Sequence, residues 1–486
     1  MGKEDKNARP EKEDKMGLTE KKSGDFSEWY NQVVLRSELA DYAPVKGFMV
    51  IRPRAYAIWE TIQQNFNEVI AAHGVSNAYF PLLIPESFFK KEAQHAEGFA
   101  PELAWIEDKD KSEERVAIRP TSETIMYDSY GKWIRSWRDL PLRINQWCNV
   151  LRWEVKQTKL FLRTREFLWH EGHCVYSTEQ ECVKEALLFL DEYRKLVEGL
   201  LAIPVIAGEK TEGERFAGAK QTFTIEALMP DGKALQMGTS HNLGQNFAKG
   251  FGITYLDENG SRQLAWQNSW GFSTRLIGAM VMLHSDDKGL VLPPRIAREK
   301  VVIVPILFED SKKKVLEKAR EMSKTLKKFN AFVDERDHYS AGWKFNEWEL
   351  KGVPIRVEIG PKDLEKKQAV LVRRDNAQKK IVKIAGIEKE ISKELGEMQA
   401  SMLGKARKLL DAGMAEAKDW QEMKSLLEQK KMVLVHFCNR VSCEKEIKEE
   451  TTATARCIPF KEKKTSGKCV KCGSPAQQKV IFAKAY

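Results

Sequence analysis

The chain has 486 residues, enough for roughly two to four domains, and its 42% of hydrophobic and 9% of aromatic residues are ordinary for a globular protein. The 80 basic residues exceed the 70 acidic ones and give a formal net charge of +10. This excess favours a polyanionic partner but excludes a uniformly basic, DNA-coating surface. No segment approaches the roughly 20 apolar residues that a membrane-spanning helix requires.

Residues 1–25 are rich in charges of both signs. They contain no apolar core of a secretory signal, and their acidic residues argue against a transit peptide. The sequence therefore predicts a disordered tail and a cytoplasmic location.

The next part is predicted to be helical, with one helix in residues 26–47 and another in residues 54–73 that ends at Gly74. The second helix carries apolar residues at helical spacing on one face: Ile58, Ile62, Phe66, Val69 and Ile70. "NAYFPLLIP" (residues 77–85) predicts a strand.

From Val116 to about Leu283, short strand-like runs alternate with turns. Asp231-Gly232 between two such runs predicts a β-hairpin, and successive hairpins indicate an antiparallel sheet. A helix is predicted in residues 178–201.

After Pro293 and Pro294 the pattern changes to alternating strands and helices, which is typical of a small α/β domain. A long helical stretch follows and leads to a cysteine-bearing end module.

The stretch "LRWEVKQTKLFLRTREFLWHEGH" (residues 151–173) is the densest in charge. Arg152 and Glu154 are predicted on one face of a strand, and Arg163, Phe167 and Glu171 follow at spacing four. Arginine binds phosphate and stacks on rings, so this group favours a nucleotide site; a salt-bridged sheet face is the alternative. No P-loop or dinucleotide-binding glycine motif occurs in the chain.

Three further segments strengthen the nucleotide interpretation. "AIRPTSET" offers Thr121 and Glu123, and "NSWGFSTRLIG" places Gly271 four residues before Arg275. "ALQMGTSHNLGQNF" offers four polar side chains: Gln236, Thr239, Ser240 and His241.

The end module contains two cysteine pairs, Cys438-x4-Cys443 and Cys469-x2-Cys472. Four thiolates with this spacing suit a tetrahedral zinc ion, and a closed four-thiolate site is typically structural. Cys457 fits neither pair. Free thiols are the alternative.

Together these segments resemble the class II aminoacyl-tRNA synthetases. Residues 152–171 resemble motif 2 of that family, residues 271–275 resemble motif 3, and residues 54–85 resemble motif 1, which forms its dimer interface. Six longer segments are similar to the archaeal/eukaryotic type of prolyl-tRNA synthetase: "FSEWY", "RPTSET", "GTSHNLGQNF", "QNSWG", "GLVLPPRIA" and "GWKFNEWELKGVPIRVEIGP". The resemblance extends over residues 26–486.

The resemblance implies an α+β multidomain fold: a class II antiparallel sheet flanked by helices, an α/β anticodon-binding domain and a small zinc-bearing C-terminal domain. The implied boundaries are 1–25 for the tail, 26–292 for the catalytic domain, 298–400 for the anticodon-binding domain and 405–486 for the zinc-binding domain.

Residue roles follow from the same resemblance. Proline would be bound by Thr121, Glu123, Arg152, Trp169, Phe216 and His241. ATP would be bound by Arg152, Glu154, Arg163, Phe167, Gln236, Thr239, Ser273 and Arg275. Arg152 and Arg275 would be catalytic. The anticodon would be read by Glu349 and Arg356. Zinc would be held by Cys438, Cys443, Cys469 and Cys472.

The implied reaction joins L-proline to tRNA(Pro) in two steps, through prolyl-adenylate, with ATP and Mg²⁺, in a homodimer. Residues 172–235 are already used by a helix and strands, so no editing domain is expected between motifs 2 and 3. We therefore expect alanine and cysteine to be activated measurably. The family also ends in a tyrosine that approaches the active site, as this chain ends in Tyr486.

Two alternatives remain at this point. A catalytically inactive, synthetase-like tRNA-binding protein would be expected to have lost Arg152, Arg163 and Arg275, all of which are present. A sister class II synthetase for threonine, histidine or glycine is disfavoured by the segment matches. "HEGH" (170–173) and "EMSKT" (321–325) are similar to the HIGH and KMSKS signatures of class I synthetases. HIGH belongs after an early Rossmann strand, whereas "HEGH" lies in the motif 2 segment and "EMSKT" lies in a lysine-rich helical run. We therefore interpret both similarities as coincidence.

Overall fold

The computed structural model describes residues 17–93, 102–107, 114–462, 466–476 and 478–486. Most of the predicted tail, residues 1–16, lies outside the described residues. The described chain forms two compact units. Unit 1 comprises the residues up to Ser37, Ser285–Val291 and Glu299–Ile391. Unit 2 comprises Glu38–His284, Leu292–Arg298 and Ser392–Tyr486.

These units divide the chain differently from the expected domains. Helix α1 (Phe26–Arg36) and residues 285–291 cluster with unit 1, whereas residues 405–486, called the C-terminal module below, cluster with unit 2. The domain boundaries given above therefore stay predictions.

Unit 2 is built on one large sheet, whose strands follow, within the described residues, the order β19, β20, β24, β21, β8, β9, β10, β13, β7, β6, β3. Neighbouring strands from β8 to β6 pair antiparallel, as predicted. The bounds are β3 Ser76–Asn77, β6 Leu142–Leu151, β7 Glu166–Tyr176, β8 Ile206–Glu209, β9 Gln221–Leu228, β10 Ala234–Gly244, β13 Trp266–Ser273, β19 Met414–Glu416, β20 Met432–Phe437, β21 Thr454–Pro459 and β24 Gln478–Ala483.

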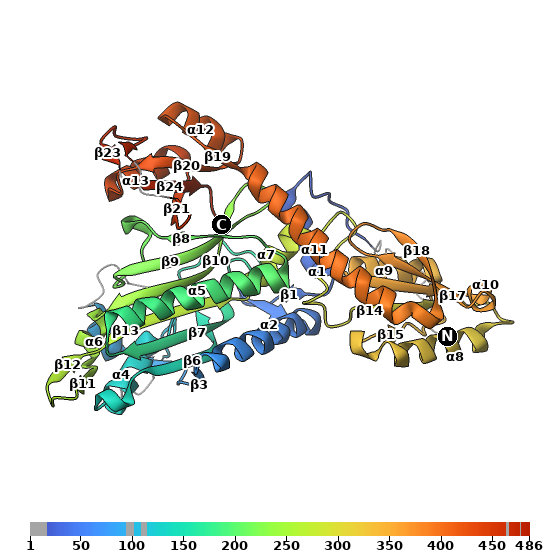
Figure 1. Ribbon diagram of the computed structural model, residues 1–486, viewed down its shortest axis with the longest axis horizontal. Coiled ribbons are helices and arrows are strands. Elements are labelled where there is room, and N and C mark those ends of the chain that lie inside the picture. Colours follow the sequence, from blue (N-terminus) through green and yellow to red (C-terminus); the bar gives the residue numbers. More distant parts are fainter. Residues whose placement is uncertain (1–16, 94–101, 108–113, 463–465, 477) are drawn as a thin grey trace, which may run out of the picture. The chain divides into compact units, whose positions relative to one another are not determined.

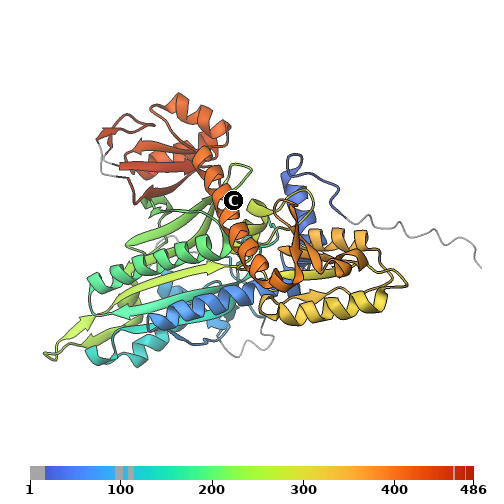
Figure 2. The same cartoon turned by 45° about the vertical axis from the view of Figure 1, so that its right-hand side comes forward.

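Two long helices, α2 (Pro53–Ala72) and α5 (Glu179–Leu201), cover one face of this sheet (Figures 1 and 2). Phe189 of α5 stacks on Trp270 of β13 with ring centroids 3.9 Å apart, and Phe66 of α2 contacts the same ring at 6.3 Å. Because side chains alternate along a strand, the residues next to Trp270 face the opposite side. That opposite face is free to form a site.

Local signals explain where these two helices begin and end. Pro53 starts α2 at a position where its missing N–H costs nothing, and Gly74 follows the end of α2 with a φ of +72°. Thr178 caps α5 by accepting a hydrogen bond from the backbone N–H of Glu181. Both helices were predicted from the sequence.

The smaller elements of unit 2 surround the sheet. Their bounds are β1 Ala40–Tyr42, β2 Met49–Ile51, β4 Leu83–Pro85, α3 Glu86–Ala93, β5 Val116–Ile118, α4 Glu123–Trp133, η1 Trp137–Asp139, η2 Glu212–Glu214, α6 Asn246–Phe251, β11 Thr254–Leu256, β12 Arg262–Leu264, α7 Arg275–His284, α12 Trp420–Glu428, α13 Val441–Thr451, β22 Gly467–Lys468 and β23 Pro475–Ala476. Helix α11 (Ile387–Gly413) begins in unit 1 and continues in unit 2.

Two strand predictions are wrong. Residues 77–85 form two short strands instead of one, because Phe80 leaves the strand geometry: its N–H donates to the Gln146 side chain and its carbonyl accepts from Arg119. Strand β6 ends at Leu151, so Arg152 and Glu154 lie in the turn beyond it rather than on the strand. The hairpin at Asp231-Gly232 is confirmed between β9 and β10.

Unit 1 is a five-stranded α/β unit in the described residues, with strand order β15, β14, β16, β17, β18. Strand β14 is parallel to β15 and β16, and β17 is antiparallel to β16. The bounds are β14 Val301–Pro305, α8 Lys312–Thr325, η3 Lys327–Phe329, β15 Phe332–Val333, α9 Ala341–Leu350, β16 Ile355–Ile359, α10 Pro361–Glu365, β17 Gln368–Arg373, β18 Lys379–Lys383 and η4 Ile384–Gly386. The mixed α and β content agrees with the predicted fold class.

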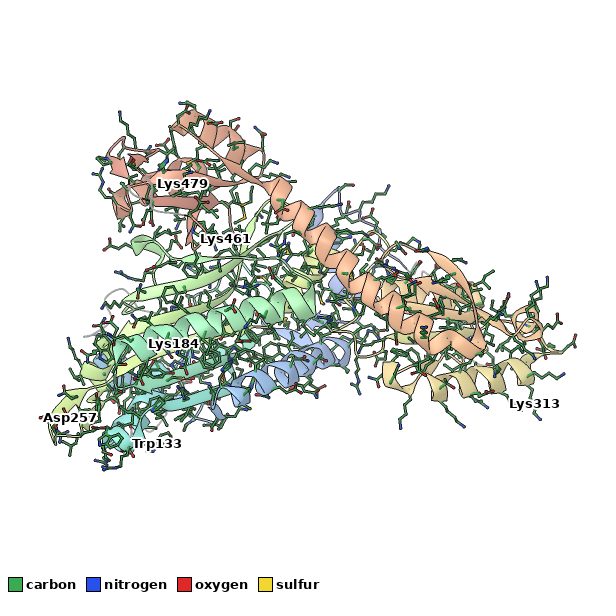
Figure 3. All side chains as sticks on the ribbon, in the orientation of Figure 1. Trp133, Lys184, Asp257, Lys313, Lys461 and Lys479 are labelled. Atoms are coloured by element: carbon green, nitrogen blue, oxygen red, sulfur yellow. The ribbon has the colours of Figure 1, made fainter. Side chains whose placement is uncertain are left out.

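The charged residues are distributed over the surfaces of both units, as Lys184 of α5 and Lys313 of α8 illustrate (Figure 3). Among the described residues, no helix is both long and apolar enough to cross a membrane.

Candidate active site

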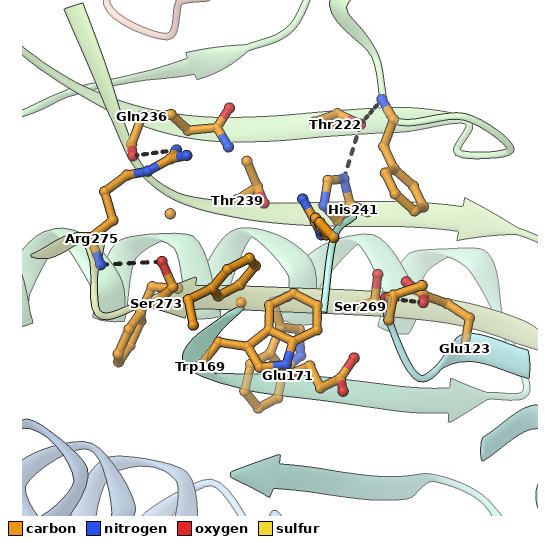
Figure 4. Close-up of a pocket in the computed structure, with 18 of the residues that line it drawn as sticks. Glu123, Trp169, Glu171, Thr222, Gln236, Thr239, His241, Ser269, Ser273 and Arg275 are labelled. Carbon is orange, nitrogen blue, oxygen red and sulfur yellow. Dashed lines mark hydrogen bonds between the residues drawn. The ribbon is translucent and has the colours of Figure 1, made fainter. Parts of the chain in front are cut away.

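Unit 2 contains a cavity of about 400 Å³ on the sheet face that α2 and α5 leave free (Figure 4). Strands β7, β13 and β10 form its floor. The strand register aligns their side chains in cross-strand rows: Trp169 with Ser273, Glu171 with Gly271 and Thr239, and His173 with Ser269 and His241. Every second side chain of these three adjacent strands therefore points to the same face and contributes to the floor.

One end of the cavity is acidic and buried. Glu123 begins α4, is 4% exposed, and accepts a hydrogen bond from the Thr121 hydroxyl. Glu171 accepts from the Ser122 hydroxyl and is 3.0 Å from Nε2 of His173. Side chains from strand β7, from the start of helix α4 and from the two residues before it therefore converge on one buried group of charges.

The two carboxyl groups differ in their surroundings. Burial, reinforced by the charge of Glu171, raises the pKa of Glu123. Burial opposes ionisation of Glu171 as well, but the hydrogen bond and charge of His173 outweigh it and hold the pKa of Glu171 low. The same contact raises the pKa of His173 against the effect of burial. Glu171 and His173 satisfy each other, which leaves Glu123 to bind a cation from the cavity.

The opposite end carries two guanidinium groups, those of Arg152 and Arg275. The Nε of Arg275 donates to the carbonyl oxygen of Leu162 at 3.1 Å, and its Nη1 lies 3.5 Å from the carbonyl oxygen of Gln236 (Figure 4). Burial and the charge of Arg152 lower the pKa of Arg275 to about 10, so it remains protonated at neutral pH. Two mutually repelling arginines in one cavity form a site for a polyanion.

Arg152, at the basic end, also interacts electrostatically with the carboxyl groups of the acidic end. Its guanidinium carbon is 5.3 Å from the ring centroid of Phe167 and 5.8 Å from that of Trp169. Burial lowers its pKa, while the charges of Glu154, Glu123 and Glu171 act in the opposite direction. It can therefore contact both an amino acid at the acidic end and a phosphate at the basic end.

Aromatic rings form a wall beside the acidic end. The rings of Phe216 and His241 lie 4.7 Å apart, and Nδ1 of His241 is 3.0 Å from the Thr222 hydroxyl. Burial, together with the charges of His173 and Lys210, lowers the pKa of His241 to about 3, so it is neutral at physiological pH. This wall offers an uncharged surface to an apolar side chain.

Most of the predicted site residues lie together. Twelve line the cavity: Thr121, Glu123, Arg152, Glu154, Phe167, Trp169, Phe216, Gln236, Thr239, His241, Ser273 and Arg275. Arg163 is the exception, since its exposed side chain follows a turn at Lys159–Leu162 and is not among the lining residues. Its charge nevertheless contributes to lowering the pKa of Arg275.

The lining also includes residues to which no role was assigned, among them His173, Ser269, Lys210 and Glu171, the last of which was named only as part of the charged stretch. Glu171 and His173 follow Trp169 at alternate positions of one strand, and Ser269 lies two residues before Gly271, so period-two alternation could have identified them. Lys210 lies just beyond β8, and no local pattern distinguishes it from other lysines.

The predicted anticodon residues are in unit 1. Glu349 and Arg356 line one small depression of the surface together with Trp348, Val353 and Val372–Arg374. Arg356 is 8% exposed, and its Nη2 donates to Glu358 at 2.9 Å. Glu349 is 3.3 Å from the ammonium group of Lys288.

Among the residues that the structure describes, two groups of side chains could hold a metal ion, and in each the ligand atoms lie within 4.8 Å of one another. The first is the buried set Glu123, Glu171 and His173. The second is the predicted set Cys438, Cys443, Cys469 and Cys472. In the second, Sγ of Cys438 lies 3.6 Å from that of Cys443 and 3.8 Å from that of Cys472.

The cysteine group fits zinc. Four thiolates at about 2.3 Å from a tetrahedral zinc ion are about 3.8 Å from one another, close to the two separations above. Zinc held by these four residues would stabilise the fold and leave no open position for chemistry. Cys457 is buried and takes no part in the cluster, as predicted.

Comparison with known proteins covers most of the chain. Residues 105–284 match the tRNA synthetase class II core domain (G, H, P, S and T), residues 300–394 match the anticodon binding domain, and residues 420–486 match the C-terminal domain of prolyl-tRNA synthetase.

Full-length relatives give the same result. The chain is 51% identical over 466 residues to a proline–tRNA ligase from Alkaliphilus oremlandii, covering 95% of this chain and 96% of that protein. It is 48% identical over 477 residues to a proline–tRNA ligase from Cenarchaeum symbiosum, covering 97% and 100% respectively.

Proposed function

The chain belongs to the proline–tRNA ligases, a family of class II aminoacyl-tRNA synthetases, and on this basis we propose that its cavity joins L-proline to tRNA(Pro) through prolyl-adenylate. One observation carries the proposal. A single cavity has a buried carboxyl group at one end and two guanidinium groups at the other. An amino acid and a nucleoside triphosphate fit such a cavity side by side.

Proline binds at the acidic end. Its ammonium group is held by the Glu123 carboxylate, because a buried cation needs a carboxylate partner. The Thr121 hydroxyl orients that carboxylate. The pyrrolidine ring packs against Trp169, Phe216 and the neutral His241.

MgATP binds at the basic end. Phe167 stacks on the adenine, and Glu154, Gln236, Thr239 and Ser273 complete the contacts within the cavity. Arg163, which does not line the cavity, has to turn toward the nucleotide to join them. Gln236 and Thr239 offer the oxygen atoms that Mg²⁺ prefers. Arg152 and Arg275 contact the phosphates, and Arg152 also contacts the proline carboxylate.

The first step needs no covalent intermediate with the enzyme. The proline carboxylate attacks the α-phosphate, a new C–O–P bond forms, and pyrophosphate leaves with its electron pair. Arg152 and Arg275 stabilise the charge that develops on the phosphate oxygens. The site contributes mainly positioning and electrostatic stabilisation. The terminal ribose hydroxyl of tRNA then attacks the prolyl carbonyl, and AMP leaves.

Unit 1 recognises the tRNA in this proposal. Residues 300–394 match an anticodon-binding domain, and Glu349 and Arg356 are the proposed readers of the anticodon. Arginine suits the edge of guanine. To reach it, Arg356 has to exchange part of its contact with Glu358 for the base.

The remaining assignments are also proposals. We assign a structural zinc ion to the four cysteines, a cytoplasmic location to the protein, and a homodimer interface to residues 54–85. This range carries three exposed large apolar side chains, Tyr56, Tyr79 and Leu83. Residues 177–233 are all described and form α5, β8, η2 and β9, so they contain no inserted editing domain.

Aminoacylation with purified components tests the function. The wild-type enzyme, MgATP and a transcript of tRNA(Pro) are incubated with radiolabelled proline. We expect acid-precipitable, ATP-dependent label on tRNA(Pro) and none on a tRNA for threonine, histidine or glycine. Charging of one of those tRNAs with its own amino acid instead would identify a sister synthetase, and no charging at all would indicate a binding protein.

A further inference from the structure

The C-terminal module is continuous with the catalytic sheet. Strand β21 pairs with β8 through Ile458–Glu209 and Pro459–Gly208. A Cβ atom on Gly208 would lie 2.4 Å from the carbonyl oxygen of Ile458, so glycine at this position permits the close approach of the two strands. The module can therefore place a side chain directly behind the cavity.

Arg456 of β21 is that side chain. Its Nε and Nη2 donate to the same oxygen, Oε2, of Glu226 on β9, at 3.0 and 2.7 Å. The other oxygen of Glu226 accepts from the ammonium group of Lys210 and from the hydroxyl of Thr224, both at 2.9 Å. Glu226 is 0% exposed, and its four hydrogen bonds saturate the carboxylate.

This buried triad adjoins the phosphate end of the cavity. Lys210 lines the cavity itself. Glu226 is the register partner of Gln236, whose carbonyl oxygen is contacted by Arg275. The charges of Glu226 and Arg456 also act in opposite directions on the pKa of Arg275, which burial and Arg152 lower most.

The charge balance depends on Arg456. With it present, one carboxylate is shared by two cations, and the triad presents a net positive charge behind the polyanion site. Without it, Glu226 cancels the charge of Lys210, and one buried carboxylate oxygen loses both of its donors. Loss of this net positive charge behind the phosphate end weakens binding of the phosphates.

We infer that Arg456 of the C-terminal module is a positioning residue of the MgATP site, acting through Glu226 and Lys210. The inference rests on the proposed function. It makes the C-terminal module part of the adenylation machinery, in addition to carrying the cysteine cluster. The alternative is that the triad only fastens the module to the sheet.

ATP–pyrophosphate exchange with the full-length enzyme separates the two roles. If Arg456 positions the MgATP site, R456M raises the KM for ATP about tenfold while the KM for proline stays within about twofold. In R456M/E226Q no carboxylate cancels the charge of Lys210, so the net positive charge is restored and the KM for ATP returns to within about threefold of wild type. R407M is the matched control, since it removes another arginine–glutamate pair of unit 2, with Glu198 on α5, that does not line this cavity.

A fastening role gives a different result. It predicts fewer active molecules and a lower melting temperature in R456M, with both KM values unchanged, and no rescue by E226Q. If R456M does not fold, R456Q carries the test: it removes the charge but keeps a hydrogen-bond donor for Glu226. A rise of about threefold in its KM for ATP supports the inference, and an unchanged value overturns it. Proline-dependent exchange by the wild type in the same assay shows that the proposed function stands independently.

Discussion

Glu123 is the residue on which recognition of the amino acid is expected to depend most. It is a buried carboxyl group whose neighbours Glu171 and His173 already satisfy each other. Replacing it by glutamine removes the charge but keeps the shape. We predict that E123Q lowers kcat/KM for proline about 100-fold or more, since truncating one partner of a buried charge pair costs about 3 kcal/mol.

The assay is pyrophosphate exchange, with ATP and proline varied separately. The KM for ATP should change little, because the nucleotide binds at the other end of the cavity. E179Q, which removes the charge of a half-buried glutamate paired with Lys220, is the matched control. An E123Q enzyme with a normal KM for proline would contradict the assignment.

The carboxyl group of Glu123 is also expected to make kcat/KM for proline depend on pH. Burial raises the pKa of Glu123, and the protonated, neutral form attracts the ammonium group of proline less. The value of kcat/KM for proline should therefore fall as the pH falls, with its acid limb above the usual glutamate pKa of about 4.3. His241, with a pKa lowered to about 3, does not titrate in this range. A profile that stays flat down to about pH 4.5 would exclude Glu123 as the titrating group.

The residues that line the cavity were predictable from the sequence where they belong to a recognisable motif. Twelve of the proposed proline and ATP residues line the cavity because motif spacing already tied them to strand and helix ends. Lys210 and Arg456 could not be found in this way. Their importance arises from strand pairing between β8 and β21, whose residues are far apart in the chain.

At the scale of elements, the two cysteine pairs of the C-terminal module predict a bound metal ion. We expect about one zinc ion per chain by elemental analysis of the purified protein, because the four thiols match a tetrahedral site. C469S should lose the metal and lower the melting temperature. C457S should retain it, because Cys457 is a buried cysteine outside the cluster. Equal zinc content in both variants would show that the metal lies elsewhere.

Long elements were predicted better than short ones. The apolar face of α2, the cap of α5 and the β9–β10 turn each carry a local signal. The segment of residues 77–85 carries a strand-like composition, but the tertiary hydrogen bonds that Phe80 donates to Gln146 and accepts from Arg119 decide its path. The end of β6 at Leu151 was missed because the alternating sequence pattern that predicts a strand continues beyond Leu151. Leu151 is the last residue of β6 that pairs with β7.

At the scale of the whole molecule, the first prediction concerns assembly. Two exposed apolar side chains of the proposed interface range are Tyr56 and Leu83, at 43% and 41% exposure. Sedimentation of the wild type should give a dimer, and Y56E/L83E should give a monomer, because buried unpaired charge disrupts an interface. L256E alters an equally exposed leucine outside that range and should leave the dimer intact. A monomeric wild type would refute the interface.

The second prediction at this scale concerns how well the enzyme discriminates between amino acids. The chain between β7 and β10 holds no additional domain in the described residues, and a pocket discriminates by only about 1–3 kcal/mol per methylene. We therefore predict that cysteine and alanine support pyrophosphate exchange at a measurable rate, well below that of proline. Undetectable exchange with cysteine, at concentrations where proline is saturating, would mean that this cavity excludes cysteine by a mechanism other than pocket size.

The central claim is that this cavity activates proline, and the most direct test is ATP–pyrophosphate exchange measured with each of the twenty amino acids in turn. If the cavity activates proline, we expect exchange dominated by proline, with small signals from cysteine and alanine. Exchange dominated by threonine, histidine or glycine, or none with any amino acid, would contradict it.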